Sequence, residues 1–132
     1  MNSSKLLQWA AMSGLIAVML GAFGAHGLKP LIDEKTLHAY NTAVFYHFLH
    51  TLVLLSMALW HGEKSGNQFT WSVRLFLAGM LGFSGSLYAI ALSKAAGIDI
   101  SWLGPVTPMG GLLLMGGWLM LFLHAHQNNK QS

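Results

Sequence analysis

One apolar stretch of the sequence carries polar residues whose types and spacing could support chemistry. At 100° per residue, Tyr40, His47 and Thr51 fall within about 20° of one line along a helix. His50 lies about 60° to the side of His47. Imidazole exchanges protons near neutral pH and is also a common metal ligand. The spacing therefore predicts a polar helix face with candidate groups for proton transfer or ligand binding.

Residues from two other apolar stretches are expected to approach this face. His26 ends the first stretch, where the chain leads toward Tyr40 and His47. Ser84 and Tyr88 share one face of the third stretch, because residues four apart lie on the same side of a helix. The candidate polar cluster is therefore His26, Tyr40, His47, His50, Thr51, Ser84, Ser86 and Tyr88.

Three interpretations of this cluster are open. In the first interpretation, the histidines are neutral and hydrogen-bonded to nearby hydroxyls or carbonyls, and so orient the helices. Alternatively, the cluster lines a polar cavity for protons or a small solute. In the third interpretation, His26, His47 and His50 bind a metal or haem. The apolar stretches offer no carboxylate or cysteine for such a site, and His26 is about 10 Å too shallow to meet His50.

Enzymatic chemistry has little support in the sequence. The four acidic residues, Asp33, Glu34, Glu63 and Asp99, all fall in predicted loops, and there is no cysteine. No phosphate-binding glycine loop, nucleophile elbow or zinc-protease helix is present. We therefore predict no catalytic residue, no bound metal and no cofactor.

Long gaps between the charged residues define the elements that must position this cluster. Of the 132 residues, 54% are hydrophobic and 8% are charged, and mean hydropathy is +0.51. A helix that spans a bilayer needs about 20 largely apolar residues. Four charge-poor stretches meet this length, and we expect helices at about 6–28, 39–60, 72–93 and 107–124. The prediction is one all-α domain over 1–132, a bundle of four transmembrane helices with short loops.

Two alternatives to this architecture fit the sequence less well. A soluble bundle needs a polar face on each helix, but Trp118 has the only polar side chain in 112–123. A cleaved signal peptide is suggested by Lys5 and a passable cleavage site at 22–24. However, the first apolar run has 23 residues, whereas the apolar region of a signal peptide usually has about 7–15, and this length disfavours cleavage.

Charged and aromatic residues at the helix ends bear on orientation. Trp9, Trp60 and Trp71 are expected at one membrane surface and Trp102 at the other, with Trp118 packed inside the bundle. On the side of the termini lie Lys5, Lys64, Arg74 and Lys130, and on the other side lie Lys29, Lys35 and Lys94. The side of the termini thus carries four basic residues against three on the other side, and because basic residues are more frequent on the cytoplasmic side, this favours a cytoplasmic location for both termini.

Small residues recur at helical spacing and indicate close helix packing, because transmembrane helices associate through such surfaces. The candidate packing positions are Gly14, Gly21, Gly24, Gly79, Gly82, Gly116 and Gly117. The fourth helix is expected to start with Thr107 as its N-cap and Pro108 in its first position. Gly110 and Gly111 would then lie in the first turn.

Several short motifs occur in a fixed order along most of the chain. They are GAFGAHGL at 21–28, Tyr46-His47 with His50-Thr51, FSGSLY at 83–88, and TPMGG at 107–111 followed by Gly116-Gly117-Trp118. In this combination the sequence resembles the YgdD/YwdK-like family of small bacterial inner-membrane proteins, a domain of unknown function. The resemblance implies a four-helix, multi-pass protein of the bacterial inner (plasma) membrane. It implies no activity, substrate or cofactor.

Our first functional hypothesis is a non-enzymatic accessory subunit or self-associating bundle, in a homo-oligomer or a larger membrane complex. The alternatives are a minimal transporter or proton-conducting oligomer that uses the polar face at 39–60, and a haem- or metal-binding redox subunit. The basic residues are dispersed, so no nucleic-acid partner is expected beside the lipid bilayer.

Overall fold

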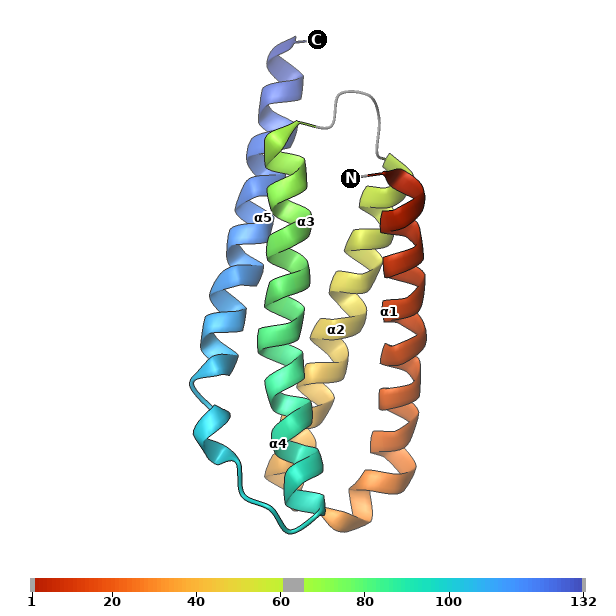
Figure 1. The fold of residues 1–132 in the computed structure, drawn as a ribbon, viewed down its shortest axis with the longest axis vertical. Helices are drawn as coiled ribbons and strands as arrows, with labels where there is room; N and C mark the ends of the chain where they lie inside the picture. The colour runs from red at the N-terminus through yellow and green to blue at the C-terminus, as the bar shows by residue number, and fades with distance from the viewer. Residues whose placement is uncertain (1, 61–65, 132) are drawn as a thin grey trace.

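The computed structural model describes residues 2–60 and 66–131, and in these residues every regular element is a helix. Helix α1 (Ser3–Phe23) continues through a π-helical segment, η1 (Gly24–Leu28), and a 3-10 turn, η2 (Lys29–Leu31). Helix α2 (Glu34–Trp60) returns antiparallel to it. Helix α3 (Asn67–Met80), the π-helical η3 (Leu81–Gly85) and α4 (Ser86–Ala95) form one continuous rod. A 3-10 turn, η4 (Ser101–Leu103), precedes α5 (Val106–Gln131) (Figure 1).

The described helices include four that are long and apolar enough to cross a membrane: Ser3–Leu31, Glu34–Trp60, Asn67–Ala95 and Ser101–Asn129. At 1.5 Å per residue each exceeds the roughly 30 Å of a hydrocarbon core. Large apolar side chains such as Leu59 and Leu81 are about three-quarters exposed, at 74% and 76%. The predicted fold class, an all-α bundle of four transmembrane helices, is confirmed.

The helices are longer than the charge-poor stretches from which they were predicted. Helix α1 begins at Ser3, where the side chain of Asn2 accepts a hydrogen bond from the Ser4 backbone N–H at 3.0 Å. Helix α2 begins at Glu34 rather than near 39, and α3 begins at Asn67 rather than near 72. Polar and charged residues are compatible with a helix once it leaves the hydrocarbon core. Glu63, Lys64 and the side chain of Lys130 lie outside the described part of the chain.

Asp33 caps the start of α2. Its carboxylate accepts hydrogen bonds from the Thr36 backbone N–H at 2.9 Å and from the Thr36 hydroxyl at 2.8 Å. These bonds favour the ionised form and lower the pKa of Asp33 below its ordinary value of 3.8. Lys94 of α4 donates to the same Thr36 hydroxyl at 3.2 Å, which joins α4 to the start of α2.

The Asp33 cap predicts a pH dependence of stability at low pH. Because the folded pKa is lowered, the stabilising contribution of the carboxylate is complete above 3.8 and is lost as the pH falls through the folded value. The Asp33→Asn variant would keep a capping oxygen but would not titrate at this position. The difference in Tm between the wild type and this variant should therefore be constant near neutral pH and should change only below 3.8. A constant difference down to the lowest pH at which the protein stays in solution would contradict the ionised cap.

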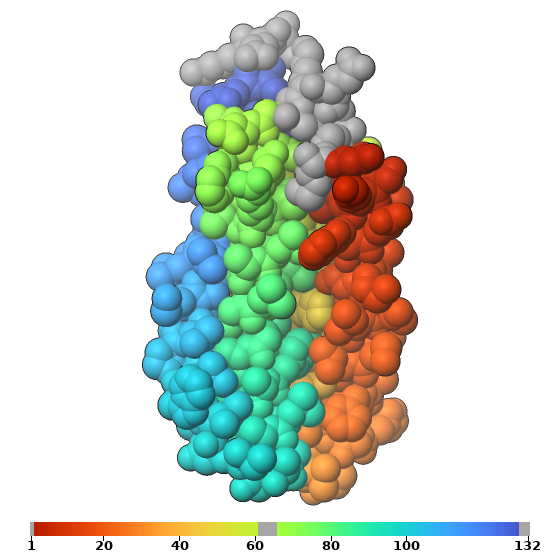
Figure 2. Space-filling view, in the orientation of Figure 1, coloured from red at the N-terminus to blue at the C-terminus, as the bar shows by residue number. Residues whose placement is uncertain are grey.

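The helices pack as two antiparallel hairpins. Helix α1 packs along α2, and α3 with η3 packs along α5. The hairpins meet mainly where α2 contacts α3, η3 and α4. Helices α1 and α3 make little contact with each other, and a seam between them runs along the molecule (Figure 2), with atoms of α2 visible at its bottom.

The candidate packing glycines face neighbouring helices of the same chain. In the second hairpin, Gly79 faces Leu114, Gly82 faces the Cα atom of Gly110, Gly116 faces Leu75, and Gly117 faces the ring of Phe76. In the first hairpin, Gly14 faces Thr51, Gly21 faces Val44, and Gly24 faces the ring of Tyr40. Substitutions at these positions would therefore first test folding of one chain rather than assembly of several.

The start of α5 differs from the prediction. The helix begins at Val106, so Thr107 and Pro108 lie within its first turn and Thr107 is not the N-cap. The Thr107 hydroxyl lies 2.6 Å from the Ser86 hydroxyl of α4 and forms a hydrogen bond with it. A hydroxyl in an apolar environment needs such a partner. Gly110 lies directly against the backbone of η3, and Gly111 lies against the ring of Phe83.

Candidate functional site

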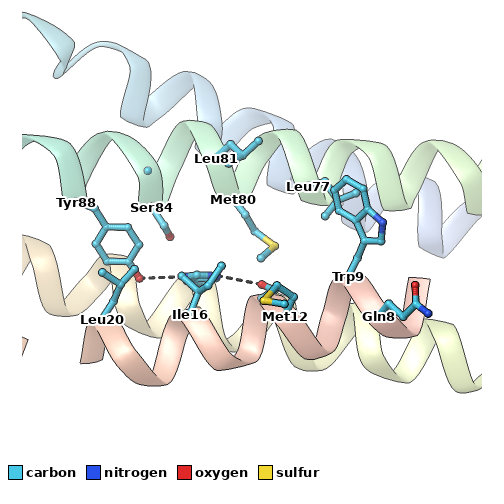
Figure 3. A pocket seen from close by; sticks show the side chains of 13 residues that line it. Gln8, Trp9, Met12, Ile16, Leu20, Leu77, Met80, Leu81, Ser84 and Tyr88 are labelled. Carbon is cyan, nitrogen blue, oxygen red and sulfur yellow. Dashed lines mark hydrogen bonds between the residues drawn. The ribbon is translucent and has the colours of Figure 1, made fainter. Parts of the chain in front are cut away.

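A groove of about 660 Å³ opens along the seam between α1 and the α3–η3–α4 rod. Trp9, Met12 and Ile16 line it from α1, and Leu77 and Met80 line it from α3. Figure 3 shows these side chains facing each other across the opening, with Leu20 and Tyr88 at one end and Gln8 at the other. Because α1 is not packed against α3, the groove is open sideways, toward the lipid that would surround the bundle.

A hydrogen-bonded network centred on His47 of α2 lies in the wall of this groove. His47 Nδ1 is 3.1 Å from the Tyr88 hydroxyl, and His47 Nε2 is 3.0 Å from the Ser13 hydroxyl. Ser13 Oγ is 2.6 Å from Thr51 Oγ1. The Thr51 hydroxyl donates to the backbone carbonyl of His47 at 2.8 Å. The network thus joins α1, α2 and α4 beside an apolar opening.

Counting donors assigns the proton positions in this network. The Thr51 proton is used on the His47 carbonyl, so the proton between Ser13 and Thr51 belongs to Ser13. Ser13 then accepts from His47 Nε2–H, and in a neutral ring Nδ1 is an acceptor. Nδ1 therefore receives the hydrogen bond of the Tyr88 hydroxyl. All the donors are satisfied with His47 uncharged and protonated on Nε2.

The network closes on itself rather than crossing the bundle. It starts at Tyr88 and ends at the backbone carbonyl of His47, within about one helical turn of where it began. A path for protons across a membrane would need further groups toward both ends of the helices. The geometry is better suited to holding one polar group of a ligand beside an apolar surface.

His50, three residues after His47, has a different environment. It is 2% exposed, and its Nδ1 lies 2.8 Å from the Tyr46 carbonyl, which can only accept. Nδ1 therefore carries the proton, and Nε2 accepts from the Trp118 indole N–H at 3.2 Å. Trp118 is 46% exposed, so it does not pack inside the bundle as predicted but bridges α5 to α2 from the rim. With both ring nitrogens paired, the arrangement of His50 is that of a structural histidine.

Removing the indole N–H should therefore weaken the contact between α5 and α2. In Trp118→Phe the buried His50 Nε2 loses its donor, and we expect a loss of stability of about 0.6 kcal/mol, the average for a hydrogen bond between membrane helices. Unfolding in a detergent titration would measure it. As a control, Trp102→Phe changes a side chain that is 75% exposed and should have no effect. If both variants unfold alike, the His50–Trp118 bond is not stabilising.

Of the other predicted cluster residues, Tyr40, Ser84 and Ser86 form hydrogen bonds between helical segments, whereas His26 is exposed. The Tyr40 hydroxyl donates to the Leu20 carbonyl at 2.6 Å. The Ser84 hydroxyl donates to the Ala43 carbonyl at 2.8 Å, and Ser86 pairs with Thr107. His26 is exposed on η1 and does not line the groove, so its expected approach to Tyr40 or His47 is wrong. Gly24, two residues earlier, occupies the side of η1 that faces Tyr40.

Sequence reasoning missed Ser13, which brings α1 into the His47 network. A single serine in an apolar helix gives little signal, although Ser13 directly precedes Gly14 on the side that approaches α2. Among residues 2–60 and 66–131, no group of three His, Asp or Glu side chains is placed to bind a metal. Asp33, Glu34 and Asp99 lie at or beyond the helix ends rather than in the groove.

Comparisons with known proteins place these features among membrane proteins without an assigned activity. Residues 20–111 match the family model described as "Protein of unknown function (DUF423)". The UPF0382 membrane protein YwdK of Bacillus subtilis is 40% identical over 116 residues, covering 87% of this chain and 90% of YwdK. The UPF0382 inner membrane protein YgdD of Escherichia coli is 37% identical over 125 residues, covering 95% of this chain and 92% of YgdD. No solved structure matches the chain.

Proposed function

Since the chain belongs to the DUF423 family of membrane proteins, whose function is unknown, we propose that it is a non-enzymatic accessory protein that binds a lipid-phase molecule in the groove between α1 and α3–α4. The resemblance drawn from the ordered motifs is confirmed by these relatives. The relatives' names give membrane location, and for YgdD the inner membrane, but no activity.

The observation that carries the proposal is a groove that is both apolar and locally polar. Its volume of about 660 Å³ lies within the roughly 300–1,000 Å³ of small-molecule sites, which are mostly apolar with a few convergent polar groups. Ser13, His47, Ser84 and Tyr88 supply those groups on its walls. Because the opening faces sideways, a molecule would enter from the bilayer rather than from water.

The non-enzymatic role is supported by the state of the polar groups. The hydroxyls of Ser13, Ser84 and Tyr88 donate to partners within the chain, and no carboxylate lines the groove in the described residues. A nucleophile would need an adjacent base to activate it. His47 Nε2, the ring nitrogen that faces Ser13, carries a proton and donates to the Ser13 oxygen, so it is not free to take the Ser13 proton.

Native mass spectrometry of the protein, extracted gently from its own membranes, would test the proposal. We expect one chain with a non-covalently bound molecule from the lipid phase. Ile16→Trp places a larger side chain in the groove and should abolish the adduct. Val18→Trp is the matched control, because Val18 is 59% exposed on α1 and does not line the groove.

Three outcomes of this experiment would overturn the proposal. One is a chain that carries no adduct, and another is an adduct that survives Ile16→Trp as well as Val18→Trp. The third is a second polypeptide or a second copy of this chain bound in place of the small molecule. It would favour instead the hypothesis of a subunit in a larger complex or of a self-associating bundle.

For orientation, we propose that both termini face the cytoplasm. The start of α1 and the end of α5 lie at the same end of the bundle (Figure 1), and Lys5 and Arg74 are near this end. The chain has no cysteine, so single cysteines report on accessibility without background. In intact cells, Ser101→Cys should react with an impermeant maleimide, whereas Ser4→Cys should react only after permeabilisation. The reverse pattern would invert the orientation.

A further inference from the structure

At the end of the groove that is lined by Leu20 and Tyr88, the side chains have unused hydrogen-bond acceptors but no unused donors. The Tyr88 hydroxyl proton is used on His47 Nδ1, and the Ser84 proton is used on the Ala43 carbonyl. The Ser13 proton is used on Thr51, and His47 Nε2–H is used on Ser13. Among the lining side chains that the structure describes, the remaining N–H donors are those of Gln8 and Trp9, at the opposite end of the groove.

The oxygens on the same wall keep lone pairs that nothing in the network occupies. A hydroxyl oxygen accepts up to two hydrogen bonds. The Tyr88 oxygen donates to His47 and accepts from no described group, and the Ser84 oxygen likewise only donates. A ligand that brings a donor can therefore bond without disturbing the chain. A ligand that brings only an acceptor would meet lone pairs, and one of the existing bonds would have to break.

The absence of a carboxylate among the described residues that line the groove also restricts the charge of the ligand. A cationic donor such as an amine would enter an apolar site without a carboxylate to pair with, which is costly inside a bilayer. The groove extends along α1 from Gln8 to Leu20, about 18 Å at 1.5 Å per residue, with apolar side chains over most of this length. An uncharged molecule with a long apolar body and one hydroxyl group satisfies both conditions.

Building on the proposed function, we propose that the groove binds an uncharged lipid-phase alcohol whose hydroxyl donates to the Tyr88 phenolic oxygen. The apolar body lies against Met12, Ile16 and Met80 and extends toward Trp9. The hydroxyl is then inside the bilayer and the tail points toward the surface from which α1 starts, opposite to the usual orientation of a membrane amphiphile.

Two matched photoreactive probes would test this inference. One is a long-chain primary alcohol with a diazirine near the hydroxyl, and the other is its methyl ether, which accepts but does not donate. The purified protein is labelled in nanodiscs at about pH 8, where imidazole is neutral. We expect the alcohol to half-saturate labelling at a concentration about three- to tenfold lower than the ether, corresponding to one hydrogen bond between groups in a membrane. Crosslinks should map to Leu20, Ser84 or Tyr88.

The outcomes separate this inference from the function on which it rests. Equal labelling by the two probes, reduced for both by Ile16→Trp but not by Val18→Trp, would overturn the alcohol and keep the groove as a binding site. Crosslinks near Gln8 and Trp9 would overturn the inverted orientation of the ligand. Labelling that Ile16→Trp leaves unchanged for both probes would overturn the binding function itself.

Discussion

Alanine in place of Gly110 will destabilise the bundle by about 3 kcal/mol, the upper part of the range for overpacking a close contact. Gly110 of α5 lies directly against η3, where a methyl group would overlap the backbone nitrogen of Phe83 and lie 2.8 Å from its Cα atom. A side chain could rotate away from such a contact, but a helix backbone cannot. The helices would have to separate, which would also weaken the neighbouring contact between Gly79 and Leu114. Thermal unfolding in detergent would measure the loss.

The adjacent residue provides the control for this prediction. A methyl group at Gly111 would lie 3.7 Å from the ring of Phe83, which is an ordinary van der Waals contact. Alanine also favours a helix over glycine by about 1 kcal/mol. Gly111→Ala should therefore unfold at the same temperature as the wild type or slightly above it. If the two variants behave alike, α5 and η3 do not approach as closely as the structure has them.

Tyr40→Ala will have the second large effect, a loss of about 3–5 kcal/mol, as for other buried aromatic residues that are reduced to alanine. The ring of Tyr40 is fully buried, between Gly24 of η1 and the ring of Tyr88, whose centroid is 5.2 Å away. Removing it leaves a cavity where the first hairpin meets α4. The same substitution removes the 2.6 Å hydrogen bond that the Tyr40 hydroxyl donates to the Leu20 carbonyl.

Two further variants divide this effect into its parts. Tyr40→Phe keeps the ring and removes only the hydrogen bond, so it should cost about 0.6 kcal/mol. Phe45→Ala removes a ring of similar size that is 63% exposed toward lipid, and it should be close to neutral. Detergent unfolding of the three variants would rank them. A Tyr40→Phe variant as unstable as Tyr40→Ala would show that the hydrogen bond, rather than the packed ring, stabilises this region.

The two histidines of α2 illustrate the limit of reasoning from spacing. His47 and His50 are three residues apart, and in the sequence both are histidines on an apolar helix. Their roles differ because their partners come from other helices. Trp118 of α5 completes the pairing of His50, whereas Ser13 and Tyr88 connect His47 to the groove wall. None of these three partner side chains lies near its histidine in the sequence, so no local pattern could have distinguished the two histidines.

The glycines show the same division. Their spacing predicted close helix contacts, but it did not say which helices would meet. Gly82 and Gly110, from segments predicted for different purposes, lie against each other. Gly110 was expected only as part of the first turn of a helix, yet it lies directly against the backbone of η3. In the fold, these glycine faces pack the two arms of each hairpin against each other.

The sequence by itself determined that this protein spans a membrane with four helices, because the exclusion of charge from about 20 consecutive residues is a local property that needs no partner. The tertiary structure alone decided which helices pair, where the groove opens and which ring nitrogen of His47 and of His50 carries the proton. In water, an apolar stripe on a helix marks the face that packs. Helices α1 and α5 are apolar on nearly all sides, because the sides that do not contact protein contact lipid, and so no apolar stripe identifies the helices with which they pack.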